Sequence, residues 1–210
     1  LQGIDGIMSL AAASNEDLAT TSDIVTDALT AFGLKASDSG HFADVLAQAS
    51  ANANTNVGMM GESFKYVAPV AGALKYSVED VSLALGLMAN ASVKGSMAGT
   101  SLKTSLANMA APTDKMEAAM DKYGISLTKR NGEMKTMHEV LDNLRSSLGG
   151  LSETEQTAAA STIFGKEAMA GMLAIINASE DDYNKLTAAV NNADGASQQM
   201  ADTMLDNMNG

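Results

Sequence analysis

Apolar residues recur every three or four positions along nearly the whole chain. The pattern is clearest in four sets: Leu18, Val25, Ala28, Leu29 and Phe32; Phe42, Val45, Leu46 and Ala49; Val78, Val81, Leu85 and Met88; and Met137, Val140, Leu141, Leu144 and Leu148. This spacing places each set on one face of an α-helix. The pattern therefore predicts amphipathic helices that pack around a common apolar core.

The expected helix boundaries are marked by local sequence signals. Five hydroxyl residues have an acid three positions later, the spacing of a capping box: Ser14 with Asp17, Ser77 with Asp80, Thr136 with Glu139, Ser152 with Glu155, and Ser179 with Asp182. Glycines that favour helix ends follow at Gly33, Gly124, Gly149-Gly150 and Gly165. We expect about ten short capped helices in one compact all-α domain over residues 1–210.

One stretch departs from the helical pattern. Residues 125–128 and 133–135 flank a polar turn that contains Asn131-Gly132. An Asn-Gly pair supplies the positive φ values that a tight hairpin turn requires. The sequence predicts at most one small β-hairpin near residues 125–136, with a polar loop as the alternative.

Composition narrows the class of protein. Hydrophobic residues make up 46% of the chain, but only 4% are aromatic, and 15 are Met. Such a core consists of small, flexible side chains. The absence of Cys excludes disulfides and thiolate metal sites. The apolar stretches 81–93 and 168–179 are too short to span a membrane. The start at Leu1 and the polar end at Gly210 favour a fragment of a longer chain.

The formal net charge of −12 is unevenly distributed. Residues 1–62 hold eight acids and one base, residues 167–210 hold seven acids and one base, and the segment between them is nearly balanced. Binding to phosphates depends on basic residues that displace counterions. We therefore expect no nucleic-acid partner, and for the same reason no attraction to anionic membrane surfaces.

Candidate chemistry is sparse. His138 and Asp142 would share a helix face, but a second His and a third ligand are missing, so we expect no metal and no cofactor. Glu167, after Phe164-Gly165-Lys166, is a candidate acid of a lytic enzyme by position alone, and a chain without Trp offers little for a sugar-stacking cleft. His41 is expected to form an exposed pair with Asp44. We expect no catalytic residues.

The central segment contains four distinctive stretches: Met60-Gly61-Glu62-Ser63-Phe64-Lys65-Tyr66-Val67-Ala68-Pro69-Val70-Ala71, Tyr76-Ser77-Val78-Glu79-Asp80-Val81, Leu85-Gly86-Leu87-Met88-Ala89-Asn90-Ala91 and Lys94-Gly95-Ser96-Met97-Ala98-Gly99-Thr100-Ser101-Leu102-Lys103. Together they resemble the conserved core region of phage tail tape measure proteins. Tyr123-Gly124-Ile125, Asn131-Gly132 and Ile163-Phe164-Gly165 follow in the family's order. The resemblance covers about residues 14–205.

The positions that stand out in this segment are expected to serve packing. The family-motif and packing positions are Pro69, Gly95, Gly99, Thr100, Gly124, Phe164 and Gly165. Ala91, Gly95 and Gly99 are spaced by four, which on one helix forms a smooth stripe that a second backbone can approach closely. Alternatively, Lys94-Gly95 is a loop and the next helix begins at Ala98-Gly99-Thr100. Pro69 either kinks a helix or lies in its first turn.

The resemblance implies a structural protein of a phage or prophage and not an enzyme. The whole protein would occupy the tail lumen, set tail length during assembly in the host cytoplasm, and leave the virion ahead of the DNA. Its expected partners are tail tube protein, tail assembly chaperones, baseplate proteins and further copies of itself. A secreted all-α virulence or export substrate is the alternative, because it would share the helical pattern and the acidity.

Overall fold

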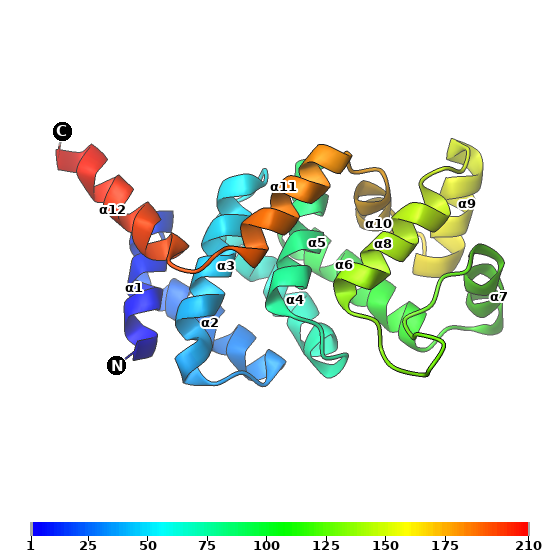
Figure 1. Ribbon diagram of the computed structural model, residues 1–210, viewed down its shortest axis with the longest axis horizontal. Coiled ribbons are helices and arrows are strands. Elements are labelled where there is room, and N and C mark those ends of the chain that lie inside the picture. Colours follow the sequence, from blue (N-terminus) through cyan, green and yellow to red (C-terminus); the bar gives the residue numbers. More distant parts are fainter. Residues whose placement is uncertain (1, 210) are drawn as a thin grey trace.

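The chain forms a succession of short helices (Figure 1), described for residues 2–209 in a computed structural model. The elements are α1 (Gln2–Ser14), α2 (Leu18–Phe32), the 3-10 helix η1 (Ala36–Asp38), α3 (Ser39–Asn52), α4 (Val57–Ala73), α5 (Val78–Asn90), α6 (Gly95–Ala110), α7 (Asp114–Tyr123), α8 (Met137–Leu148), α9 (Glu153–Phe164), α10 (Met169–Ile176), α11 (Glu180–Asn191) and α12 (Ala196–Asn209). The all-α prediction is confirmed, with twelve α-helices in the described range where about ten were expected.

The segment between α7 and α8 is a minimal hairpin. Thr128 and Met134 form a single antiparallel bridge, and the Lys135 amide donates to the Leu127 carbonyl at 2.8 Å. In the turn, Gly132 has a φ of 86°, whereas Asn131 does not adopt a positive φ. The expectation that both Asn131 and Gly132 take positive φ is therefore wrong. The Asn131 side chain instead accepts from the Glu133 amide at 3.1 Å, which stabilises the turn locally.

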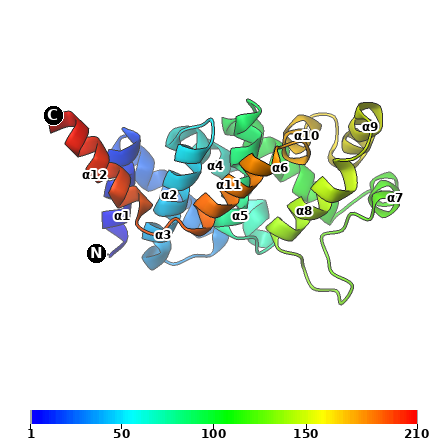
Figure 2. The ribbon, with the colours of Figure 1, turned by 45° about the horizontal axis from the view of Figure 1, so that its top comes forward.

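The helices run out along the molecule and then return. In the outgoing part, each helix packs against the one two places later, so that α1, α3 and α5 form one row and α2, α4 and α6 a second. The chain then passes through α7, α8, α9 and α10 and comes back to α11, which packs on α3 and α5, and to α12, which packs on α1 and α3. Figures 1 and 2 show the elongated result, with α1 and α12 at one end and α7 and α9 at the other.

The core follows this path, and α5 lies at its centre. Residues 81–89 of α5 are all buried, because α3, α10 and α11 pack around this helix. The aromatic part of the core is small: the Phe42 ring meets the Phe64 ring edge-on at 5.2 Å, and Phe32 lies 6.0 Å from Phe64. The predicted apolar faces are buried except at Phe32, which is partly buried, and at Leu18, which is 51% exposed at the first position of α2.

Most of the predicted helix starts are correct. Thr136 and Ser152 form complete capping boxes with Glu139 and Glu155. Ser77 and Ser179 also cap their helices by accepting from the amides three residues later.

The predicted cap at Ser14 is wrong. Ser14 is the last residue of α1, and its hydroxyl donates to the Leu10 carbonyl at 2.7 Å. Asp17 caps α2 instead, because its carboxylate accepts from the Thr20 amide at 2.9 Å. Among the predicted stops, Gly33 and Gly124 end α2 and α7 in the left-handed conformation, at φ values of 66° and 65°.

Candidate functional site

The motif positions on α6 include one true point of backbone contact. Gly99 lies against the backbone of Ser63 on α4, and a Cβ at Gly99 would overlap the Ser63 carbonyl oxygen. The Ser63 hydroxyl in turn donates to the Gly95 carbonyl at 2.7 Å and to the Met59 carbonyl at 3.1 Å. The small residues thus let α4 and α6 approach at backbone distance, and this contact joins the two halves of the central motif.

The predicted stripe of Ala91, Gly95 and Gly99 on one helix is wrong. Ala91 follows the last residue of α5, Ser92 takes a left-handed φ of 67°, and Gly95 begins α6 with a φ of 56°. The alternative of a loop at Lys94-Gly95 is correct, although the new helix begins a few residues before Ala98. Gly95 is therefore required by its φ and not by packing, since a Cβ there would meet nothing closer than 4.0 Å.

Three further predicted positions also lie around α6. Thr100 lines a cavity of about 240 Å³ together with Met97 and Glu167. The Phe164 ring is fully buried, and the Phe164 carbonyl accepts from the Asn108 side chain of α6 at 2.8 Å. Gly165 ends α9 with a φ of 88°. With Gly95 and Gly99, the structure thus brings five of the seven predicted positions to one helix, and Asn108 is the contact that the sequence did not indicate.

Gly124 lies apart from this group, at the end of α7. Its carbonyl accepts from the Asn143 side-chain amide at 3.0 Å. The Asn143 side-chain oxygen accepts from the Lys135 ammonium at 2.8 Å and from the Ser126 amide at 3.3 Å. Asn143 thus ties the minimal hairpin to α8. No pattern in the sequence indicates this role, because Asn143 belongs to no local capping motif.

Pro69 lies in the interior of α4 and not in its first turn, so the second of the two predicted alternatives is wrong. The helix continues past Pro69 to Ala73. Proline lacks an N–H, which leaves the Lys65 carbonyl without its usual donor in the helix. Both residues face a groove between α2 and α4, on the side of α4 away from α6.

The groove between α2 and α4 has a volume of about 610 Å³. Its floor contains Ile24, Ala28, Phe64 and Ala68. The two helices meet closely beside it, because Gly61 lies directly against the Ile24 side chain and Gly72 against the Ala31 carbonyl. The sequence patterns did not single out the groove residues. The one available indication was Asp23 and Asp27, which lie one helical turn apart without a neighbouring base and so mark an acidic face of α2.

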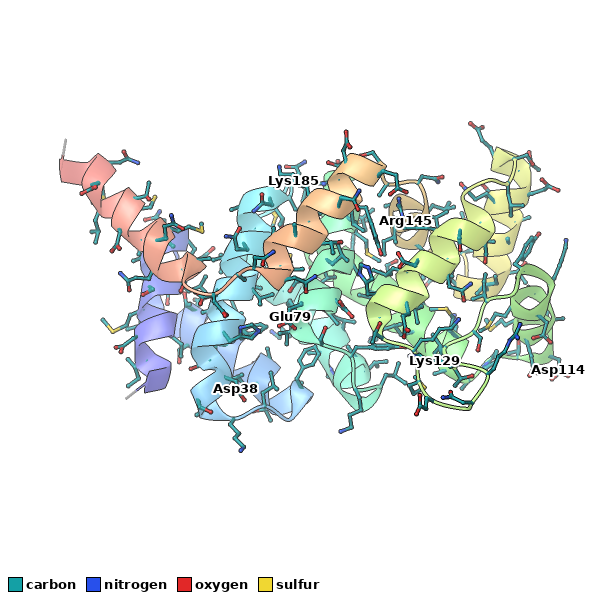
Figure 3. All side chains as sticks on the ribbon, in the orientation of Figure 1. Asp38, Glu79, Asp114, Lys129, Arg145 and Lys185 are labelled. Atoms are coloured by element: carbon teal, nitrogen blue, oxygen red, sulfur yellow. The ribbon has the colours of Figure 1, made fainter. Side chains whose placement is uncertain are left out.

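His41 joins three parts of the chain, and its predicted pairing with Asp44 is wrong. Its Nε2 atom lies 2.5 Å from the Glu79 carboxylate of α5, and its Nδ1 atom lies 3.0 Å from Asp194, just before α12. Figure 3 shows Glu79 near the middle of the molecule. Partial burial opposes protonation of the ring, but the hydrogen bonds and charges of Glu79 and Asp194 outweigh it and raise the pKa of His41.

Asp44 has a different role, at the start of α12. Its carboxylate accepts from the Gly195 amide at 2.7 Å, the Ser197 amide at 2.8 Å and the Ser197 hydroxyl at 2.5 Å. Asp44 therefore acts as the N-terminal cap of a helix that begins about 150 residues later in the chain.

His138 and Asp142 share a face of α8, as predicted. The His138 Nε2 atom lies 3.6 Å from the Asp142 carboxylate, and the ring stacks 5.5 Å from the Tyr183 ring. The Tyr183 hydroxyl donates to Asp142 at 2.6 Å, and burial together with this hydrogen bond raises the pKa of Tyr183. Every polar group in this contact serves to dock α11 on α8, and the described residues 2–209 contain no group of His, Asp or Glu side chains placed to hold a metal ion.

Arg145 fixes the end of α10 in the same region (Figure 3). Its guanidinium donates to the Ile175 carbonyl at 2.9 Å and the Ala178 carbonyl at 2.8 Å, pairs with Glu180 at 3.0 Å, and stacks on the Tyr183 ring. Arginine suits this position because its planar fork satisfies several acceptors at once.

Glu167 lies on the surface, in the loop before α10. The cavity that it lines contains Val93, Met97 and Thr100, and none of its lining residues is aromatic. An acid of a sugar-cleaving site works from an apolar, enclosed environment, which the surroundings of Glu167 do not provide. Within residues 2–209, none of the helices has the length and apolar character needed to cross a bilayer.

Comparison with known proteins gives a consistent result. The family model described as phage-related minor tail protein matches residues 1–165. A tape measure protein of Pneumococcus phage Dp-1 is 39% identical over 99% of this chain, and a probable tape measure protein of Escherichia phage P2 is 27% identical over 97% of it. The chain spans only 18% and 25% of those two relatives. No solved structure matches the chain.

Proposed function

Because this chain belongs to the phage-related minor tail protein family, we propose that it is a structural segment of a phage tail tape measure protein. The similarity to the Dp-1 tape measure protein, 39% identical over 99% of the chain, is the observation that carries the proposal. The similarity extends over 208 residues and so spans the helical part of the chain.

In this role the parent protein sets the length of the tail while the tail tube assembles around it. It lies in the tail lumen of the virion, having assembled in the host cytoplasm, and leaves ahead of the DNA at infection. Its partners are the tail tube protein, tail assembly chaperones, baseplate proteins and other copies of itself. The segment belongs to a chain several times longer, in keeping with the fraction of each relative that it spans.

The proposed role is structural and non-catalytic. Around Glu167 and His138, the side chains that a lytic or metal-dependent mechanism would use are exposed or engaged in packing helices together. Neither relative is an exported virulence protein, so the comparisons do not support the alternative of a secreted substrate.

The test is an in-frame deletion of this segment in the phage or prophage that encodes it. We expect few normal tails, or tails of altered length, when particles are counted and measured by negative-stain electron microscopy. Mass spectrometry of purified wild-type virions should detect peptides from residues 1–210. Particles of normal number, tail length and infectivity after the deletion would contradict the proposal, as would finding the peptides only in the culture medium.

A further inference from the structure

The groove between α2 and α4 has a shape into which a third helix can dock. The two helices run in the same direction, since Gly61 faces Ile24 while Gly72, about three turns further on, faces Ala31, about two turns beyond Ile24. The floor is apolar, with Ala28, Phe64 and Ala68 buried. A row of small and apolar residues between two helices accepts the side chains of an amphipathic helix that lies along it.

The rim of the groove is acidic on balance, because three carboxylates line it against one ammonium, that of Lys65. Asp23 and Asp27 on α2 and Glu62 on α4 are exposed carboxylates. The Lys65 carbonyl lacks its helical donor because of Pro69. The Thr30 hydroxyl already donates to the Thr26 carbonyl at 2.9 Å, so its oxygen remains an acceptor. An occupant that satisfies this rim must supply donors and positive charge.

The surroundings of the groove strengthen this preference. Residues 1–73 and 192–209, which include α1 to α4 and α12, hold eleven acids and two bases, Lys35 and Lys65. This part of the chain therefore carries a net charge of −9 out of the total of −12. A field of one sign raises the local concentration of partners of the opposite sign and speeds their association.

We propose that this groove binds a basic amphipathic helix of another polypeptide. Its apolar side chains, spaced by three or four residues, lie on the floor formed by Ile24 and Phe64. Its Lys or Arg side chains reach Asp23, Asp27 and Glu62. A second copy of this chain does not fit the requirement, because among the described helices only α6 carries a net positive charge, from Lys103 alone.

The test uses a fluorescent synthetic helix of Leu, Ala and Lys, about four turns long, with Leu at every third or fourth position. Its counterpart carries Glu in place of Lys. Fluorescence anisotropy at low salt should show saturable binding of the Lys peptide with one peptide per protein, and no binding of the Glu peptide. Amide resonances of Ile24 and Ala68 should shift in a two-dimensional NMR titration.

The matched variants separate the groove from general charge attraction. The double substitution Asp23→Lys with Asp27→Lys should weaken binding by at least about tenfold. The same exchange at Asp202 and Asp206, two exposed acids one turn apart on α12, should change the affinity by less than about twofold. Ala31→Phe, which fills the groove without altering charge, should also weaken binding, with circular dichroism confirming the fold.

Three results would overturn the proposal. An equal loss of affinity in the two charge-reversed variants would show that binding depends on net charge and not on the groove. Equal binding of the Glu peptide would remove the requirement for a basic partner. Sedimentation that shows a dimer of the wild-type chain, lost when Asp23 and Asp27 become Lys, would assign the groove to a second copy.

Discussion

At the scale of single residues, two glycines of the central motif serve different physical purposes. Gly99 lies where the α4 and α6 backbones touch, so its requirement is spatial. Gly95 lies in open space at a φ of 56°, so its requirement is conformational. A substitution at each position therefore tests a different term of the folding free energy.

The first prediction concerns Gly99. We expect Gly99→Ala to destabilise the protein by about 1–3 kcal/mol, because the added Cβ forces α4 and α6 apart at the Ser63 carbonyl. Gly150→Ala is the matched control, since a Cβ there meets nothing within 4 Å. Urea unfolding followed by circular dichroism measures both. A shift of equal size in the two variants would contradict the close contact.

A second prediction at this scale concerns His41. Its pKa is raised in the folded protein above the ordinary value of 6.5, because the pull of Glu79 and Asp194 exceeds the effect of burial. The folded state therefore binds the proton more tightly than the unfolded state. The resulting stability is fully present below about pH 6.5 and is lost as the pH rises through the folded pKa.

The measurement is the urea midpoint of wild type and of His41→Gln between pH 6 and pH 8. The Asp and Glu carboxylates stay ionised between these pH values, so the stability of the His41→Gln protein should change little. The wild type should gain stability on acidification, and the difference is the contribution of His41. Parallel pH profiles would show that the contacts with Glu79 and Asp194 contribute nothing to stability.

At the scale of whole elements, the helix starts divide into those capped locally and one capped from a distance. Thr136 and Ser152 find their partners three residues away, so the sequence alone predicted them correctly. Asp44 caps α12 across 151 residues, at the Gly195 amide, and no local pattern could indicate this. The all-α fold was predictable because its signals are local, whereas the docking of α12 depends on the path of the entire chain.

The same distinction explains the motif positions. Gly124 and Gly165 end their helices as predicted, because chain termination is a local property. The predicted helical stripe through Ala91 was wrong because Ser92 adopts a left-handed φ of 67°. A serine in the sequence does not indicate this conformation. His41 was wrongly paired because its partners lie 38 and 153 residues away.

The third prediction addresses the distant cap. We expect Asp44→Asn to weaken the start of α12 by about 1–2 kcal/mol, because the charged acceptor of two backbone amides is lost. Hydrogen exchange should accelerate in α12 while α6 keeps its protection. Asp202→Asn, which alters an exposed acid on the same helix, is the control and should leave exchange unchanged. Acceleration spread evenly over all helices would contradict a local role for Asp44.

At the scale of the whole molecule, and on the proposed function, the packed shape limits the tail length for which this segment can account. As one continuous helix, 210 residues would extend about 300 Å. The out-and-back path of α1 to α12 folds this length on itself, so the packed segment is much shorter. The contribution of the segment to tail length therefore reports whether it stays packed during assembly.

The fourth prediction follows, and it rests on the proposed function. A tandem duplication of this segment in the parent gene should lengthen the tail by well under about 300 Å if the segment stays packed. Inserting a continuous helix of the same number of residues is the control, which should add about 300 Å. Electron microscopy of tails measures both. Equal lengthening by the two insertions would show that the helices unpack and lie end to end.

The contact between α1 and α12 also determines how the molecule responds to tension. Both described ends of the chain lie at one end of the molecule, where α1 packs on α12, so a pull on the two ends loads this contact first. Residues 202–208 of α12 are exposed, so only the start of this helix resists the pull. In optical tweezers, α12 should detach first and leave α1–α11 folded, and the rest should then unravel in steps. A body of this kind keeps its helices packed in the absence of force. It unfolds one helix after another when its ends are drawn through a narrow passage.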